Sequence, residues 1–167
     1  GPLSWSKSNS KIYFTSNRTA SWEYEYRNSE IYSVDINDKK IISLTDRNGP
    51  DFTPKESPNG KYIAYLGFED RVQAYQNTEL LIMDSNGKNK RVLSFNIDSS
   101  ISSFYWSSDN KGIYCTYDKY GDTKIAYLNL EGNSKDLANN LGGNSIGRPY
   151  GGGSFSVSKN GVIAYTN

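Results

Sequence analysis

Few side chains in this sequence could do catalytic chemistry. The chain has 167 residues, no histidine and one cysteine, Cys115. Without histidine, a Ser-His-Asp triad, a Cys-His dyad and a His-ligated metal site are excluded. The run from Gly152 to Ser156 lacks the second glycine of a G-x-S-x-G nucleophile elbow and has no base to pair with its serine. We therefore expect no catalytic residue, no metal site and no cofactor in this chain.

Residue types that bind ligands are concentrated in three irregular segments. Segment 68–77 holds five candidate substrate-binding residues: Glu69, Asp70, Arg71, Gln73 and Tyr75. One interpretation is that a charge here meets the charged end of a peptide. The alternative is that the three neighbouring charges pair with one another.

The other two segments leave similar alternatives open. Segment 139–153 adds the candidates Arg148 and Tyr150 just before three consecutive glycines. Glycines let the backbone approach a neighbour closely, and an arginine can bind a carboxylate through two hydrogen bonds. A simple crossover between strands would explain the same residues. Segment 17–29 alternates aromatic and acidic residues from Trp22 to Tyr26, which fits a partner surface or a lengthened hairpin.

An internal repeat indicates the elements that must position these segments. Four similar stretches begin at Ser6, Ser57, Ser107 and Ser158, a spacing of about 50 residues. Each runs through a turn into a strand-like segment rich in Ile and Tyr. Downstream, three further segments correspond: Glu30–Asp35, Glu79–Asp84 and Lys124–Asn129. A short fourth segment follows each of these, so a complete unit has four short strands.

Four strands in a repeat of this length are typical of a propeller blade. The alternative, a β-sandwich, does not repeat at blade length. We therefore expect an all-β protein, a partial β-propeller of about three and a half four-stranded antiparallel blades. The expected parts are a tag scar at 1–4, a blade with a truncated first strand at 5–46, blades at 47–94 and 95–138, and the first half of a fourth at 139–167.

Alternating strand direction sorts the connections onto two faces of the predicted propeller. The tight turns fall on one face, and the long segments 17–29, 67–77, 95–100 and 139–153 fall on the other. Long loops on a rigid scaffold commonly carry binding residues. We expect the chemically interesting residues on that second face.

Charge and hydropathy exclude several classes of partner. Lys and Arg number 19 against 18 Asp and Glu, so the net charge of +1 provides no field for nucleic acid. No apolar run approaches the roughly 20 residues of a membrane span. The compartment is not indicated. Because a partial propeller leaves strand edges and blade faces uncovered, we expect self-association through its cut edges.

The repeat Ser57-Pro58-Asn59-Gly60-Lys61-Tyr62-Ile63-Ala64-Tyr65 resembles the repeats of TolB-like propellers, although Glu56 stands where tryptophan is usual. Segments 68–80 and 146–161 resemble the propeller of prolyl oligopeptidase family serine peptidases, of the acylaminoacyl-peptidase or dipeptidyl-aminopeptidase type. That resemblance implies a propeller that gates peptide access to a separate C-terminal α/β-hydrolase domain, which this chain lacks. The alternative is a non-enzymatic, TolB-like protein-binding propeller.

The missing histidine leads to a first prediction. The purified chain should not hydrolyse aminoacyl or acylaminoacyl chromogenic substrates, because nucleophile activation needs a positioned base. Release of chromophore would be followed over hours after two independent purification schemes. Turnover that co-purifies with the chain through both schemes would contradict the prediction.

Overall fold

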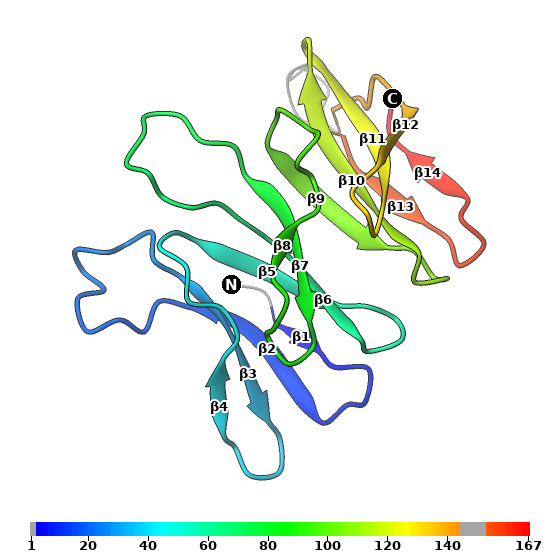
Figure 1. Ribbon diagram of the computed structural model, residues 1–167. Coiled ribbons are helices and arrows are strands. Elements are labelled where there is room, and N and C mark those ends of the chain that lie inside the picture. Colours follow the sequence, from blue (N-terminus) through cyan, green and yellow to red (C-terminus); the bar gives the residue numbers. More distant parts are fainter. Residues whose placement is uncertain (1–2, 144–152) are drawn as a thin grey trace. The chain divides into compact units, whose positions relative to one another are not determined.

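The computed structural model describes residues 3–143 and 153–167. Within these ranges every element of regular secondary structure is a β-strand, which confirms the predicted all-β class (Figure 1). None of the described residues forms a helix that could cross a membrane. The chain divides into two compact units, Gly1–Val92 and Leu93–Asn167, which are described separately below.

The first unit contains two four-stranded antiparallel sheets, each in simple up-and-down order. The first sheet consists of β1 (Ser4–Trp5), β2 (Lys11–Ser16), β3 (Glu30–Asp35) and β4 (Ile41–Ser43). The second consists of β5 (Asp51–Glu56), β6 (Tyr62–Gly67), β7 (Glu79–Asp84) and β8 (Arg91–Val92).

The second unit repeats this order once in full and once in part. Its four-stranded sheet consists of β9 (Ile101–Trp106), β10 (Gly112–Lys119), β11 (Asp122–Asn129) and β12 (Ser134–Ala138). Its two-stranded sheet consists of β13 (Phe155–Val157) and β14 (Ile163–Tyr165). The connection from β10 to β11 is a tight turn at Tyr120 and Gly121, unlike the long corresponding connections from β2 to β3 and from β6 to β7.

The repeated serines explain why all four sheets begin alike. The hydroxyl oxygens of Ser6, Ser57, Ser107 and Ser158 accept the backbone N–H of Lys11, Tyr62, Gly112 and Val162 at 3.0, 3.0, 3.1 and 3.0 Å. Each serine N–H also donates to the carbonyl of that same residue. Each serine therefore closes the turn between the first and second strands of its sheet twice, through the backbone and through the side chain.

The residue at the tip of each of these turns has a positive φ. The φ angles are 56°, 72°, 62° and 79° at Asn9, Gly60, Asn110 and Gly161. Each of these residues donates its backbone N–H to the carbonyl of the serine that begins the same turn. Glycine and asparagine tolerate this left-handed conformation better than other residues. The alternation of Asn and Gly in the repeat therefore follows from backbone geometry.

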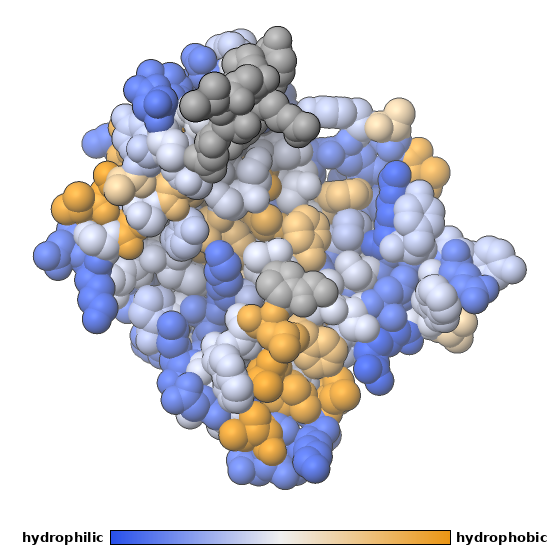
Figure 2. All heavy atoms as spheres, turned by 180° about the vertical axis from the view of Figure 1, so that it is seen from behind, coloured by the Kyte–Doolittle hydropathy of each residue, from blue (hydrophilic) through white to orange (hydrophobic). Residues whose placement is uncertain are grey.

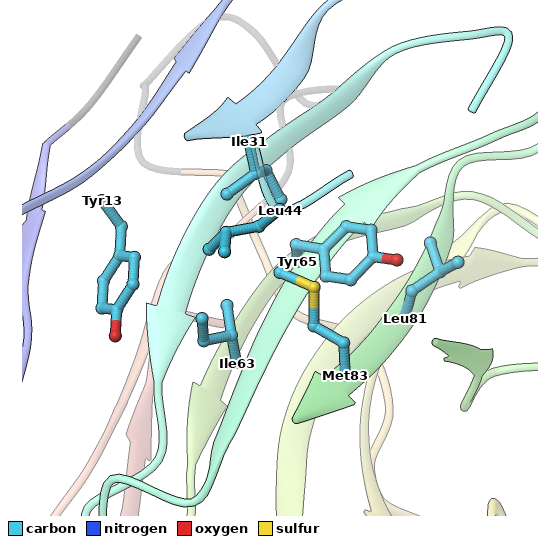
Figure 3. Packing of buried hydrophobic residues seen from close by; sticks show 7 residues of the cluster. All are labelled: Tyr13, Ile31, Leu44, Ile63, Tyr65, Leu81 and Met83. Carbon is cyan, nitrogen blue, oxygen red and sulfur yellow. The ribbon is translucent and has the colours of Figure 1, made fainter. Parts of the chain in front are cut away.

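A shared apolar core joins the two sheets of the first unit. Tyr13 and Ile31 of the first sheet, with Leu44 directly after β4, pack against four residues of the second sheet, as Figure 3 shows: Ile63, Tyr65, Leu81 and Met83. Burial of this many apolar side chains is the main stabilising contribution to such a pair of sheets. The two sheets are thus face-to-face neighbours, as adjacent blades are.

Polar contacts at the rim of this core involve Glu56. Its carboxylate accepts a hydrogen bond from the Tyr13 hydroxyl at 2.6 Å and another from the Lys7 N–H. Burial and the neighbouring carboxylate raise the pKa of the Tyr13 hydroxyl, so this tyrosine stays protonated and donates. The replacement of the repeat's usual tryptophan by Glu56 therefore gives a hydrogen-bonded link between the two sheets.

The first sheet also leaves apolar side chains exposed. The large apolar residues exposed in this sheet, in the β3–β4 turn and directly before β1 are Leu3, Trp5, Ile36, Ile41 and Ile42. In Figure 2 an orange patch lies in the lower part of the view, just above a blue tip, and the β3–β4 hairpin occupies this part of the molecule in Figure 1. The first sheet thus carries apolar side chains that its contact with the second sheet does not bury.

The serine turns give a prediction about stability. Ser57 is fully buried, whereas its counterpart Ser158 is exposed. Ser57→Ala should lower the free energy of unfolding by about 1–2 kcal/mol, because the Tyr62 N–H loses its side-chain acceptor in a site that water reaches poorly. The matched control Ser158→Ala should cost less than about 0.5 kcal/mol. Urea unfolding measures both, and equal losses would show that burial does not set the strength of these turns.

Candidate functional site

Three connecting segments of the first unit are hydrogen-bonded into one surface, which we call the three-loop surface. It comprises residues 17–29 between β2 and β3, residues 44–50 between β4 and β5, and residues 68–78 between β6 and β7. All three leave the same ends of their sheets, as the alternation of strands requires. The segments that carried most chemical interest in the sequence therefore meet here, in the part of the chain that the structure describes.

Asn48 and Asp70 connect two of these segments through reciprocal hydrogen bonds. The N–H of Asp70 donates to the Asn48 carbonyl at 2.8 Å, and the Asn48 side-chain amide donates to the Asp70 carbonyl at 3.1 Å. Between them, Gly49 has a φ of 141°, and a Cβ there would lie 2.1 Å from the Phe68 carbonyl oxygen. Only glycine permits this approach, so Gly49 sets the spacing of the two loops.

The loop 68–78 is also ordered from within. The side-chain oxygen of Gln76 accepts the N–H groups of Arg71 and Gln73 at 3.0 and 3.2 Å, and its amide donates to the Glu69 carbonyl. The Asp70 carboxylate accepts the N–H of Val72 at 2.9 Å. Gln76 thus acts as an internal brace, a role that composition alone did not indicate.

The structure places four of the five candidates in this loop on the exposed surface and one in a hollow. Glu69, Arg71, Gln73 and Tyr75 are exposed, and Asp70 is half-buried. The hollow has a volume of about 160 Å³ and is lined by residues 24–28, by Asn48 and Gly49, and by Asp70. The remaining candidates, Arg148 and Tyr150, lie outside the described residues.

The ion pair of Asp70 differs from the simplest sequence alternative. Its carboxylate lies 3.9 Å from the guanidinium of Arg27, which comes from the segment between β2 and β3. No ion pair joins Glu69, Asp70 and Arg71 to one another among the described residues. The alternative in which these three charges pair among themselves is therefore wrong, and Asp70 instead connects two loops.

The three-loop surface carries exposed aromatic rings, and those of Tyr24 and Tyr26 line the hollow. Tyr24 is 87% exposed and Tyr75 is 79% exposed, and Trp22 and Tyr26 are also mostly in solvent. The guanidinium of Arg27 lies 5.5 Å from the centre of the Tyr26 ring, within the range of a cation–π contact. Rigid aromatic side chains lose little conformational entropy on binding and bury much area, so such a surface suits a peptide or protein ligand.

A layer of buried charge lies at the strand ends beneath the three loops. Asp51 begins β5 and is 1% exposed, and its carboxylate forms a hydrogen-bonded ion pair with Arg47. Arg47 also lies 3.8 Å from Glu79 at the start of β7. Glu30 begins β3 and is 8% exposed, and its Oε2 has no hydrogen-bond partner among the described residues.

Burial raises the pKa of both carboxyl groups in this layer. The pKa of Glu30 rises to about 7, mainly through loss of hydration, with a hydrogen bond from Thr45 opposing the rise and the charges of Asp51 and Asp46 adding to it. The pKa of Asp51 rises to about 6 for the same main reason, although Arg47 opposes the rise. The single guanidinium of Arg47 thus does not fully offset the cost of ionising two buried carboxyl groups.

Sequence reasoning did not identify this layer or the partners of Asp70. Glu30, Arg47, Asp51 and Arg27 are ordinary charges in the sequence, and their burial or pairing depends on how two sheets come together. The one available signal was position, because Glu30, Asp51 and Glu79 each stand at the first residue of a strand next to a long connection. No group of three or more Cys, Asp or Glu that could hold a metal ion occurs among the described residues.

The raised pKa of Glu30 predicts a pH-dependent stability. Because the folded-state pKa lies above the unfolded value near 4.5, the free energy of unfolding is highest below that value and falls as pH rises toward 7. Glu30→Gln removes the buried ionisation and should raise the free energy of unfolding at pH 8 by about 1–3 kcal/mol. The variant should gain little at pH 4.5.

Thermal unfolding from pH 4.5 to 8 measures this effect. The charged groups that face Glu30 are Asp46, Arg47 and Asp51. The pH dependence of stability that remains in the Glu30→Gln variant therefore reports the titration of Asp51. Glu25→Gln is the matched control, because Glu25 is exposed and its pKa is lowered by hydrogen bonds from Ser21 and Asn28. A variant at Glu30 that is less stable than the parent at pH 8 would contradict the prediction.

Comparison with known proteins gives one relevant sequence match. No protein-family model matches the chain. A dipeptidyl-peptidase 5 from Porphyromonas gingivalis is 28% identical over 132 residues, which make up 77% of this chain and 19% of that protein. This chain therefore spans only a small part of the length of the peptidase that it matches.

Solved structures share the fold at low identity. A TolB from Acinetobacter baumannii superposes with a TM-score of 0.66 and 21% identity, over 98% of this chain and 36% of that one. A puromycin hydrolase gives a TM-score of 0.69 at 15% identity over 98% of this chain and 27% of that chain. An oligogalacturonate lyase in complex with manganese gives 0.71 at 12% identity, over 96% and 44% of the two chains.

These structural similarities agree with the sheets observed in each unit and with the internal repeat of the sequence. Three four-stranded antiparallel sheets and a two-stranded one correspond to three blades and part of a fourth. The peptidase match adds sequence similarity to this shared fold. The sheets of this chain are therefore blades of a partial β-propeller, the fold that the TolB and puromycin hydrolase structures share.

Proposed function

We propose that this chain is the propeller part of a serine exopeptidase, in which it restricts access to a separate α/β-hydrolase domain and binds part of the peptide substrate. The single observation that carries the proposal is the sequence match to a dipeptidyl-peptidase 5 across 77% of the chain. The catalytic serine, aspartate and histidine would all belong to the hydrolase domain, since this chain has no histidine.

The geometry of the three-loop surface supports a role in peptide binding. Its backbone is fixed by the bonds between Asn48 and Asp70 and by the Gln76 brace, so its exposed side chains are presented at low entropic cost. A peptide contacts such a surface mainly through apolar area, which the rings of Tyr24, Tyr26 and Tyr75 provide.

Charge at the same surface supports recognition of a peptide end. The Arg27 side chain is 46% exposed and lies 3.9 Å from Asp70, longer than a hydrogen-bonded pair. A loose pair of this kind can exchange its internal partner for a ligand group at small cost. In the proposal, Glu69, Arg71 and Gln73 contact the peptide from the exposed side of the loop. Arg148 and Tyr150, which lie outside the described residues, remain candidate substrate-binding residues.

A second candidate function is a non-enzymatic propeller that binds another protein. The observation that favours it is the likeness to TolB structures, which extends over 98% of this chain in one case. The coding sequence that follows Asn167 separates the two candidates. A downstream G-x-S-x-G, followed by an aspartate and a histidine, supports the peptidase, and further blades without a hydrolase domain overturn it.

Substitutions on the three-loop surface test its role in the full-length protein. Tyr75→Ala and Glu69→Ala should each lower kcat/KM for a peptide substrate by about tenfold, the effect of losing a good interface contact. Both side chains are exposed, so the melting temperature should not change. Ile36→Ala is the control, because Ile36 lies in the same unit in the β3–β4 turn, at the opposite end of its sheet. Unchanged kcat/KM in both variants would contradict the proposed role.

A further inference from the structure

Val72, in the loop between β6 and β7, has a backbone conformation that valine rarely adopts. Its φ is 56°, in the left-handed region, where a side chain branched at Cβ crowds the backbone. Eight non-glycine residues in the described part of the chain have a positive φ, and four of them are asparagine, which tolerates this region. The eight are Asn9, Lys39, Thr53, Val72, Asn89, Asn110, Tyr120 and Asn140.

Side chains of the same loop impose this conformation. The N–H of Val72 donates to the Asp70 carboxylate at 2.9 Å. The N–H groups on either side, from Arg71 and Gln73, both donate to the side-chain oxygen of Gln76. Three consecutive N–H groups thus converge on side-chain acceptors, an arrangement that a left-handed residue permits. These bonds account for the φ of position 72, but they would form as well around glycine or asparagine.

The fold gives no reason for the valine side chain itself. Val72 is 90% exposed, so burial within the chain does not favour an apolar residue there. Thr53, the other β-branched residue with a positive φ, is half-buried in β5, where the pairing with β6 shifts its register. A strained conformation that the surroundings hold in place is a feature of ligand-binding sites. Val72 therefore has a cost in stability that no contact within the described residues explains.

We propose that Val72 is a specificity-determining residue of the three-loop surface, where its side chain packs against an apolar side chain of a bound peptide. This inference rests on the proposed function and adds a residue to the peptide-binding candidates. Val72 and Asp70 are two residues apart, so their Cα atoms are separated by at most about 7 Å. A ligand residue next to the one on Val72 therefore reaches the hollow that Asp70 and Arg27 line.

Val72→Asn separates the cost of the backbone conformation from the contact with the ligand. Asparagine accepts the left-handed conformation more readily, so the melting temperature of the chain should rise by about 2–4 °C. In the full-length protein, KM for Leu-Ala-p-nitroanilide should rise about fivefold, because an apolar contact is lost. The turnover number kcat should not change, since a contact away from the scissile bond acts equally on substrate and transition state.

Two further comparisons make this result specific to the valine side chain. For Ser-Ala-p-nitroanilide, which lacks the apolar first residue, KM should change less than twofold between parent and variant. Val72→Ile retains an apolar, β-branched side chain and should keep KM for the leucine substrate within about twofold of the parent. Lys39→Asn is the matched control, because Lys39 is exposed with a φ of 59° in the β3–β4 turn, at the opposite end of its sheet. It should raise the melting temperature without changing KM.

The outcomes distinguish failure of this inference from failure of the proposed function. An unchanged KM in Val72→Asn, while Tyr75→Ala lowers kcat/KM, would overturn the role of Val72 alone. A melting temperature of Val72→Asn below that of the parent would overturn it too, because the fold itself would then favour valine. A full-length protein without peptidase activity, or with unchanged kinetics in Glu69→Ala and Tyr75→Ala as well, would overturn the proposed function and this inference with it.

Discussion

The hydrogen bonds of one serine per repeat determine how each sheet of this protein starts. The serine N–H and hydroxyl both engage the residue that opens the second strand, and its carbonyl accepts from a tip residue with positive φ. Four residues far apart in the sequence make the same contacts, which is why the chain repeats at about 50 residues. Strand direction, and hence the face to which each loop belongs, follows from this turn.

The turn is the same in all four sheets, but its surroundings are not. Ser6, Ser57 and Ser107 are buried, whereas Ser158 is exposed. In β6, which pairs with β5 and β7, the side chains of Ile63, Ala64 and Tyr65 are buried. In β14, which pairs with β13 alone among the described residues, the same side-chain types are more exposed. Stability thus depends on neighbouring strands as much as on the local sequence, which is characteristic of repeat architectures.

The local part of this organisation could be predicted from the sequence. Strands, tight turns and the all-β class follow from Tyr and Ile periodicity and from Asn and Gly at the turn tips. The site was only partly predictable, because Asp70 pairs with Arg27 from another loop and Glu30 is buried by tertiary packing. No local pattern distinguishes Arg27 or Glu30 from a solvated charge. The role of Gln76 as a brace depends on loop conformation in the same way.

Hydrogen exchange of the backbone amides at the four serine turns tests the central claim most directly. If neighbouring strands set the stability of identical turns, the amides of Lys11, Tyr62 and Gly112 should exchange slowly, near the global unfolding limit. The amide of Val162 should exchange much faster, although its hydrogen bond to Ser158 is equally short at 3.0 Å. Equal protection at all four turns would contradict this explanation.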